Sequence, residues 1–204
     1  MTMPSRFEAE KIWENGIVYR HEHDGWAPQL EQEYRFHTTG VARFSALLAE
    51  AFGIDAEKAY ILGLLHDYGK RNNEFESNIF HGLEGYREMM RMGYDEVARI
   101  CLTHTFRDKD FSNEEYNYPD QWLNESRNLL QQYDYDDYDL IVQYADLFFE
   151  GLNIVKLDDR IAAIAARYKI SPQQLKNLSD SAFNLKKQID FRCGCDSYQI
   201  LGIK

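Results

Sequence analysis

Apolar residues recur at helical spacing through most of the chain, and this period constrains the fold more than any other feature of the sequence. One stripe begins at His37 and continues, in steps of three or four residues, with Val41, Phe44, Leu48 and Phe52. Such a stripe is typical of the buried face of an amphipathic helix. A strand pattern is expected, at most, over a short piece at residues 16–19. The period therefore predicts an all-α protein.

Start and stop residues divide this pattern into separate helices. Gly53 would end the first stripe, and Asp55 would cap a helix running from residue 56 to about residue 68. The clearest start signal is Ser171-Pro172-Gln173-Gln174, which places a Ser at the N-cap, a Pro at the first helical position and a Gln at the third. Further helices are expected over residues 83–92, 95–104, from about 119, 139–150 and 158–168.

Length and charge exclude several classes of protein. A chain of 204 residues is long enough for one substantial core, so one domain is the default. Its 23 Lys and Arg against 34 Asp and Glu leave a net charge of −11, which argues against binding long nucleic acids. No apolar run approaches the roughly 20 residues of a membrane span, and no secretory leader is visible at the N-terminus. Three cysteines, an odd number, indicate reduced thiols and a cytoplasmic protein.

Several polar residues occupy positions where apolar residues are expected. His37 and His104 lie on apolar helix stripes, the pair His66-Asp67 ends the apolar run LGLL, and Asp146 lies within the segment YADLFF. A lone histidine in such a place is usually a hydrogen-bonded core residue. A buried carboxylate without a cation or a proton, however, costs several kcal/mol. One shared cause explains all five positions better than five separate ones, and a metal centre between packed helices is the usual cause.

The order of these residues resembles the HD superfamily of metal-dependent phosphohydrolases. The text Leu64-Leu65-His66-Asp67-Tyr68-Gly69-Lys70 is specific to the centre of that family, and the resemblance covers roughly residues 30 to 155. His81 lies at the start of its helix, where a histidine is usually a polar cap, so only this resemblance indicates that it is a metal ligand. Together with His104 it matches the two additional histidines of the six-ligand, dinuclear branch. The resemblance implies a helical bundle with a metal site between its helices.

Ligand roles follow from the resemblance position by position. One metal would be held by His37, His66, Asp67 and Asp146, and a second by His81 and His104, with Asp67 as the bridge between them. Such ligands suit two divalent ions, chosen from Fe, Mn, Co, Ni, Zn or Mg. The chain would divide into an N-terminal extension over 1–30, the metal-binding domain over 31–155, and C-terminal helices over 156–204 packed on the same domain.

The chemistry implied is hydrolysis of a phosphoester or phosphoanhydride bond by a metal-activated hydroxide. Asp67 and Lys70 would be the catalytic residues, and Lys70 and Arg71 would bind the substrate. The alternative to a catalytic role for Lys70 is that it is a solvated charge at a helix end. By size and motif surroundings the chain is similar to the small symmetrical dinucleoside tetraphosphatases, so a small phosphorylated substrate, a nucleotide, is expected. The oligomeric state, a homodimer included, is left open.

Two other functions are compatible with the same ligands. The inositol oxygenase-like members of the superfamily use six such ligands for a di-iron centre that activates oxygen. A non-catalytic regulatory module could also have kept a metal for stability, although none of the six ligand positions is lost here.

Three further segments are interpreted without a function. The stretch His21-Glu22-His23-Asp24 is taken as a polar loop. The acidic and aromatic run over 133–139 is taken as a solvated connection whose last residue, Asp139, caps the next helix. Cys193 and Cys195 are taken as packing or surface thiols.

Overall fold

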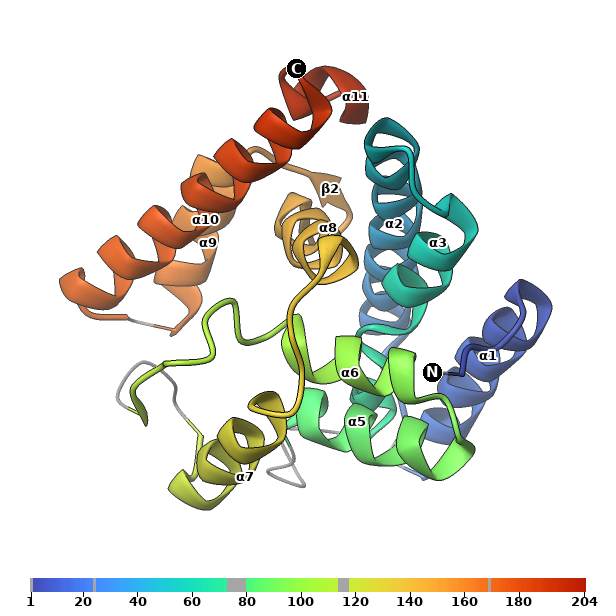
Figure 1. Ribbon diagram of the computed structural model, residues 1–204. Helices are drawn as coiled ribbons and strands as arrows, with labels where there is room; N and C mark the ends of the chain where they lie inside the picture. Colours follow the sequence, from blue (N-terminus) through green and yellow to red (C-terminus); the bar gives the residue numbers. More distant parts are fainter. Residues whose placement is uncertain (1, 24, 73–79, 114–117, 169) are drawn as a thin grey trace.

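A computed structural model describes residues 2–23, 25–72, 80–113, 118–168 and 170–204 and confirms the all-α prediction (Figure 1). The elements are α1 (Arg6–His23), α2 (Pro28–Phe52), α3 (Ala56–Leu65), η1 (Tyr68–Arg71), α5 (His81–Met92), α6 (Asp95–Thr103), α7 (Asp120–Leu130), α8 (Asp137–Ala145), η3 (Asp146–Phe148), β1 (Phe149–Glu150), β2 (Asn153–Ile154), α9 (Leu157–Tyr168), α10 (Pro172–Cys193) and α11 (Ser197–Leu201). Here α denotes an α-helix, η a 3-10 helix and β a strand. The two short strands pair with each other as an antiparallel hairpin.

The long helix α2 lies at the centre of the bundle, where α3 and α8 pack against it (Figure 1). The α5–α6 pair packs against α3 and η1, and α1 covers α3 and η1 from one side. The α9–α10 pair lies on the opposite side from α1, with α10 against α8 and α11 against the end of α2. Across the described part of the chain, no helix combines the length and the apolar character that crossing a bilayer requires.

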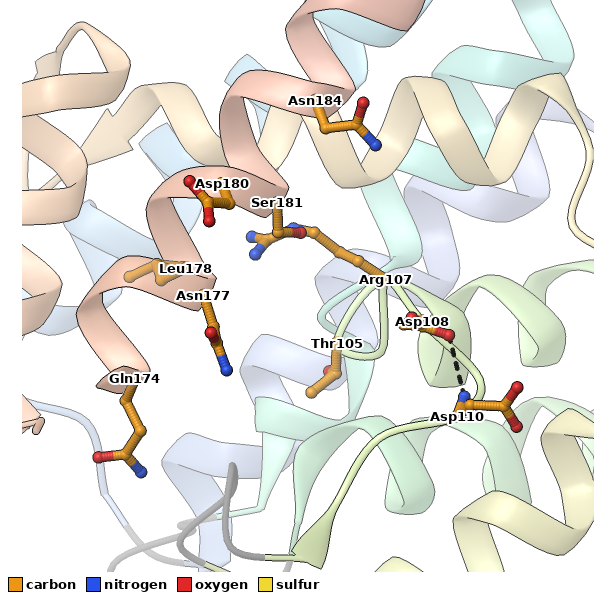
Figure 2. Close-up of a pocket in the computed structure, with 10 residues that line it drawn as sticks. All are labelled: Thr105, Arg107, Asp108, Asp110, Gln174, Asn177, Leu178, Asp180, Ser181 and Asn184. Atoms are coloured by element: carbon orange, nitrogen blue, oxygen red, sulfur yellow. Dashed lines mark hydrogen bonds between the residues drawn. The ribbon is translucent and has the colours of Figure 1, made fainter. Parts of the chain in front are cut away.

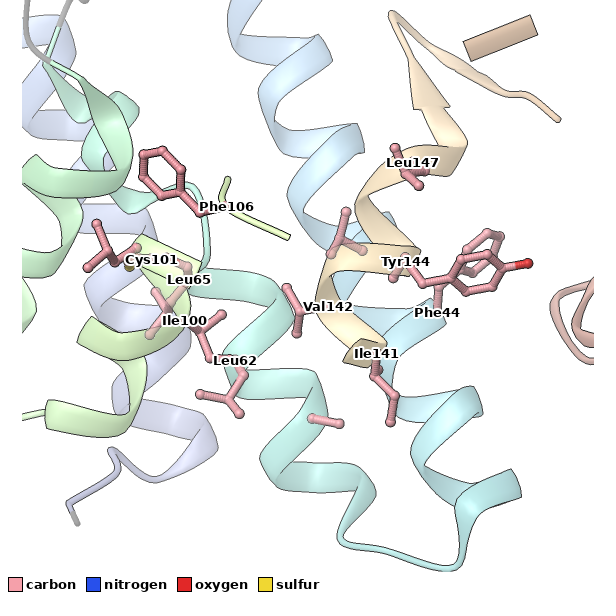
Figure 3. Packing of buried hydrophobic residues seen from close by; sticks show 14 of the residues in the cluster. Phe44, Leu62, Leu65, Ile100, Cys101, Phe106, Ile141, Val142, Tyr144 and Leu147 are labelled. Carbon is pink, nitrogen blue, oxygen red and sulfur yellow. Dashed lines mark hydrogen bonds between the residues drawn. The ribbon is translucent and has the colours of Figure 1, made fainter. Parts of the chain in front are cut away.

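The apolar stripes predicted from the sequence form a shared core. Leu62 and Leu65 of α3 lie between Ile100 of α6 and Val142 of α8 (Figure 3), and each of these side chains is at most 1% exposed. Full burial of one such side chain contributes about 1.5–3 kcal/mol. The packing of α3 between α6 and α8 therefore fixes the ends of three helices relative to one another.

Three of the predicted capping residues, Gly53, Asp55 and Ser171, are confirmed. Gly53 ends α2 with a φ of 72°, and the side chain of Asp55 accepts a hydrogen bond from the backbone N–H of Lys58. Ser171 and Gln174 form a reciprocal capping box at the start of α10. Because each cap satisfies backbone groups that the helix leaves unpaired, these boundaries follow from local chemistry.

The N-terminal predictions were wrong where the apolar pattern was weak. Residues 16–19 are helical rather than extended, and His21 and His23 end α1 rather than lying in a loop, while Asp24 lies outside the described residues. Only Ala9, Gly16 and Ile17 of α1 are buried, so the helix has too short an apolar stripe to be recognised. His21 is placed by a hydrogen-bond contact of 2.7 Å between its Nε2 and a carboxylate oxygen of Glu31.

Two predicted helices are shorter or shifted. Helix α3 ends at Leu65 rather than continuing to residue 68, and the 3-10 helix η1 begins at Tyr68. Helix α8 begins after Asp136, which forms a capping box with Asp139, and it ends at Ala145 rather than at residue 150. The cap predicted at Asp139 was therefore wrong, because Asp136 is the N-cap and Asp139 is the third helical residue that completes the box.

Candidate metal centre

His37 and His66 are brought together by close packing of α2 on α3. A Cβ at Gly63 would lie 2.9 Å from the Cα of Ala42 and 3.0 Å from the carbonyl oxygen of Val41, so only glycine allows this approach. His66 follows the last residue of α3 and is fully buried. The two Nε2 atoms consequently lie 3.2 Å apart.

Two carboxylates complete the group of donor atoms around these imidazoles. The turn at the end of α8 places Asp146 with its Oδ1 3.1 Å from His37 Nε2 and 3.6 Å from His66 Nε2. Asp67 Oδ2 lies 3.2 Å and 3.5 Å from the same two nitrogens. This first group therefore draws on α2, the end of α3 and the end of α8.

The other oxygen of Asp67 faces a second pair of imidazoles. Its Oδ1 lies 3.3 Å from His81 Nε2 and 3.5 Å from His104 Nε2, and these two nitrogens are 3.1 Å apart. A Cβ at Gly69 would lie 1.9 Å from the carbonyl oxygen of His81, so this glycine lets the start of α5 reach the turn after Asp67. The structure thus brings all six predicted ligands to one place, in two groups that share Asp67.

Backbone contacts orient two of the imidazoles. His66 Nδ1 donates to the carbonyl oxygen of Gly63 at 2.7 Å, and His104 Nδ1 donates to that of Ile100 at 3.1 Å. In a neutral imidazole this leaves the lone pair on Nε2, the atom that faces the carboxylates. A lone pair facing a carboxylate oxygen is repulsive unless a cation lies between them. The arrangement is the one by which proteins orient histidines that bind metals.

The carboxylates of the centre are held in their charged form. Burial alone would raise the pKa of the Asp67 carboxyl, but Lys70 and the surrounding imidazoles hold that pKa well below its usual range. Burial has the same effect on Asp146, and contacts with His37 and His66 lower the pKa of that carboxyl too. Burial lowers the pKa of His37, yet its contacts with the two carboxylates leave that pKa raised. Two ionised carboxylates in this position are strong cation ligands.

The spacing of the donor atoms fits divalent ions. Contacts within the two groups run from 3.1 to 3.6 Å. Around an ion with ligands at about 2.0–2.2 Å, neighbouring donor atoms lie about 3.0 Å apart in an octahedron and about 3.4 Å apart in a tetrahedron. Asp67 Oδ1 is buried and accepts no well-aligned hydrogen bond from the described residues. A metal ion would satisfy this oxygen.

The two basic residues of the motif have different surroundings. Lys70 Nζ lies 2.6 Å from Asp67 Oδ2, at the edge of the first group. Arg71 turns away, and its NH2 lies 3.6 Å and 3.4 Å from carboxylate oxygens of Glu84 and Glu88. Lys70 is therefore positioned beside the candidate centre, whereas Arg71 joins η1 to α5.

A cavity of about 490 Å³ opens onto the first group of ligands. It is lined by Arg20, Trp26, Leu30, Glu33, Tyr34, His37, Asp67, Lys70, Phe149, Glu150, Gly151, Arg160, Arg167 and Tyr168. The predicted substrate residue Lys70 belongs to this lining, and Arg71 does not. Arg20, Arg160 and Arg167 were not predicted to lie at the site, because an Arg on a helix has the same sequence pattern whether it faces solvent or a cavity.

A second cavity, of about 630 Å³, lies between α10 and the segment after His104 (Figure 2). Gln174, Asn177 and Ser181 of α10 face Thr105 and neighbouring residues across it. Thr105 Oγ1 lies 3.4 Å from His104 Nε2, so this cavity begins beside the second group of ligands. Its wall combines amide and hydroxyl groups with three carboxylates and one guanidinium group, from Asp108, Asp110, Asp180 and Arg107.

A buried ion pair ties the start of α8 to the end of α6. Arg99 NH1 lies 2.5 Å from Asp139 Oδ2, and the Thr103 hydroxyl donates to Asp139 Oδ1 at 2.6 Å. Gln143 donates to the carbonyl oxygen of Thr103 at 2.8 Å. Because Thr103 precedes His104, this network holds the second group of ligands in register with α8. No sequence pattern predicts this network.

Comparison with known proteins places the chain in a family. Residues 34–149, more than half of the chain, match the family model described as HD domain, so the protein belongs to the HD domain family. HD domains bind divalent metal ions. Within the described residues, two sets of three have ligand atoms that all lie within 4.8 Å of one another. One set is His37, His66 and Asp146, and the other is His66, Asp67 and His104.

Similarity to curated proteins is confined to part of the chain. Ribonuclease Y of Mycoplasma capricolum subsp. capricolum is 33% identical over 78 residues, which is 38% of this chain and 15% of that protein. Ribonuclease Y of Mycoplasma mycoides subsp. mycoides SC matches to the same extent. The chain thus matches about a seventh of the length of these relatives. No solved structure gives a significant match.

Proposed function

We propose that the protein is a phosphohydrolase that depends on two divalent metal ions and cleaves a phosphoester or phosphoanhydride bond of a nucleotide. The observation that carries this proposal is the position of Asp67, whose two oxygens face different pairs of histidines. One ion would be held by His37, His66, Asp67 and Asp146, and the other by Asp67, His81 and His104. Bound ions of this kind polarise phosphoryl oxygens and lower the pKa of water.

The chain's own residues would position the substrate and balance its charge. Asp67 is only 1% exposed, whereas Lys70 is 35% exposed and lines the cavity, so Lys70 is the group that a phosphoryl oxygen can reach from solvent. Its ammonium would offset the charge that develops on the phosphoryl group in the transition state. In the reaction, a water oxygen bonds to phosphorus while the bond to the leaving oxygen breaks, and the proton of the water passes to the leaving oxygen or to solvent.

Aromatic residues of the cavity support a nucleotide substrate. Half-buried Trp26 and 63% exposed Tyr168 line the cavity, whereas Tyr34 is buried and contacts the Trp26 ring with centroids 4.9 Å apart. Exposed aromatic faces bind nucleobases by stacking. A cavity beside each group of ligands is also compatible with a substrate that has two nucleoside halves, such as a dinucleoside tetraphosphate.

RNA is the second candidate substrate, because the curated relatives are named ribonuclease Y. The net charge of −11 disfavours it, since binding a long polyanion needs clustered cations. A di-iron oxygenase and a non-catalytic regulatory module are further alternatives, because each would use the same ligands.

One assay separates these functions. Purified protein should release phosphate or a shorter nucleotide from a panel of nucleotides without oxygen when Mn²⁺ or Co²⁺ is added, and an Asp67→Asn variant should not. Cleavage of RNA in preference to every nucleotide would favour the ribonuclease alternative. Oxygen consumption that requires iron would favour the oxygenase, and metal binding with no turnover would favour the regulatory module.

A further inference from the structure

The cavity beside Asp67 has walls that the HD domain match does not include. The match covers residues 34–149, whereas Arg20 comes from α1, and Arg160 and Arg167 come from α9. Residues within the match supply the ligands that the family shares. Those outside it are therefore free to determine which substrate reaches the ligands.

Arg160 and Arg167 converge on a single carboxylate. Arg160 NH1 pairs with one oxygen of Glu150, and Arg167 NH2 pairs with the other. One carboxylate cannot neutralise two guanidinium groups, so the trio retains one positive charge. Arg160 Nε is also buried and donates no hydrogen bond to any described residue. A buried donor left unpaired costs about 1–3 kcal/mol, which a further acceptor would recover.

The cavity is basic although the protein is acidic. Outside the proposed metal ligands, its charged residues are Arg20, Lys70, Arg160 and Arg167 against Glu33 and Glu150. The chain as a whole carries a net charge of −11. A cationic cleft in an acidic surface concentrates anions locally. Because the guanidinium fork matches phosphate oxygens in a two-point contact, a phosphate group is the anion that this pair of arginines fits best.

We propose that Arg160 and Arg167 form a subsite for a second phosphate group of the substrate, so that the preferred substrates carry at least two linked phosphates. The inference rests on the proposed function, which places the first phosphate at Asp67 and Lys70. The same cavity reaches both places and, at about 490 Å³, holds far more than one phosphate. A substrate with a single phosphate would leave the arginine subsite to Glu150.

Glu150 has a defined role in this arrangement. It follows Phe149 in strand β1, and the hairpin turn at Gly151 keeps its side chain between the two arginines. The carboxylate holds the guanidinium groups in place and competes with the incoming phosphate for them. Removing its charge should therefore strengthen binding of a second phosphate, whereas removing either arginine should weaken it.

Equilibrium binding of two non-hydrolysable probes tests the subsite. Methylenebisphosphonate and methylphosphonate differ by one phosphonate group, and calorimetry gives the Kd of each for the protein with its metal as purified. Arg160→Gln and Arg167→Gln should each raise the Kd for the bisphosphonate by about tenfold or more, which is the loss of one charge-assisted hydrogen bond. The Kd for methylphosphonate should change less than twofold.

Two further variants distinguish a subsite from a structural ion pair. Glu150→Gln should lower the Kd for the bisphosphonate severalfold, and Arg87→Gln, which removes an exposed surface pair with Glu125, should leave it unchanged. The subsite is refuted if Glu150→Gln weakens binding as the arginine variants do, or if both probes lose affinity equally. Thermal melts identify any variant that has failed to fold. Binding as expected without turnover of any phosphoester would leave the subsite intact and overturn the proposed function instead.

Discussion

Replacing Gly69 by alanine is expected to damage the second group of ligands. The added Cβ would lie 1.9 Å from the carbonyl oxygen of His81 and 2.8 Å from the backbone nitrogen of Gly85, where ordinary contact begins at 3.4 Å. Both neighbours are backbone atoms of α5, so the helix start must move by about 1.5 Å, the difference between 3.4 and 1.9 Å. Overpacking of this kind costs about 1–3 kcal/mol and sometimes more.

The displacement should cost more in function than in stability. Metal ligation tolerates errors of about 0.2 Å in ligand distance, and a displacement of about 1 Å can lower a rate about 100-fold. Because His81 moves with the start of α5 while His37 and His66 do not, Gly69→Ala should lose one of the two proposed metal ions. Elemental analysis gives the metal content, and urea unfolding gives the change in stability.

Gly93→Ala is the matched control for that experiment. Gly93 has a φ of 85° at the end of α5, and a Cβ there would meet nothing within 4 Å. Alanine in this left-handed conformation costs about 1–2 kcal/mol, so both variants should lose similar stability. Only Gly69→Ala should lose metal and activity. A Gly69→Ala protein with the stability, metal content and activity of the wild type would refute the packing argument.

Three other variants or reagents test separate parts of the structure. Arg99→Met should lower the free energy of unfolding by about 3–5 kcal/mol, because it leaves the buried charge of Asp139 unpaired; a loss below 1 kcal/mol in urea titration would contradict this. Lys70→Met should lower kcat about 100-fold or more and keep the metal content. An unchanged kcat would mean that Lys70 is only a solvated charge at a helix end. In thiol labelling of the native protein, exposed Cys195 should react and Cys101, whose burial strongly raises its thiol pKa, should react only after unfolding; equal rates would contradict the fold around α6.

Most of the helices and five of the six candidate ligand positions could be predicted because they leave local signals. Capping residues such as Asp55 and Ser171 act within one turn, so their chemistry is readable in sequence order. Histidines and aspartates on apolar stripes contradict the hydrophobic pattern, and this contradiction indicates a site. The position of His81 had no such signal and depended on the family resemblance. Its proximity to Asp67 is created by Gly69, whose role is visible only in three dimensions.

The remaining features depend on contacts between distant segments. Arg160 looks like any charged residue on the polar face of a helix, and only the fold brings it to Glu150 and the cavity. The buried pair of Arg99 and Asp139 joins residues 40 positions apart, and no period predicts such a partner. Helix α1 was missed because packing against α3 and η1, rather than a long apolar stripe of its own, keeps it in place.

The metal content of the Asp67→Ala variant tests the central claim most directly. Asp67 contacts both pairs of histidines, so its loss should remove the shared ligand and abolish metal loading. Elemental analysis of wild type and variant, purified side by side, should find two divalent ions in the first and none in the second. An unchanged metal content in Asp67→Ala would contradict the assignment of a metal centre built around this carboxylate.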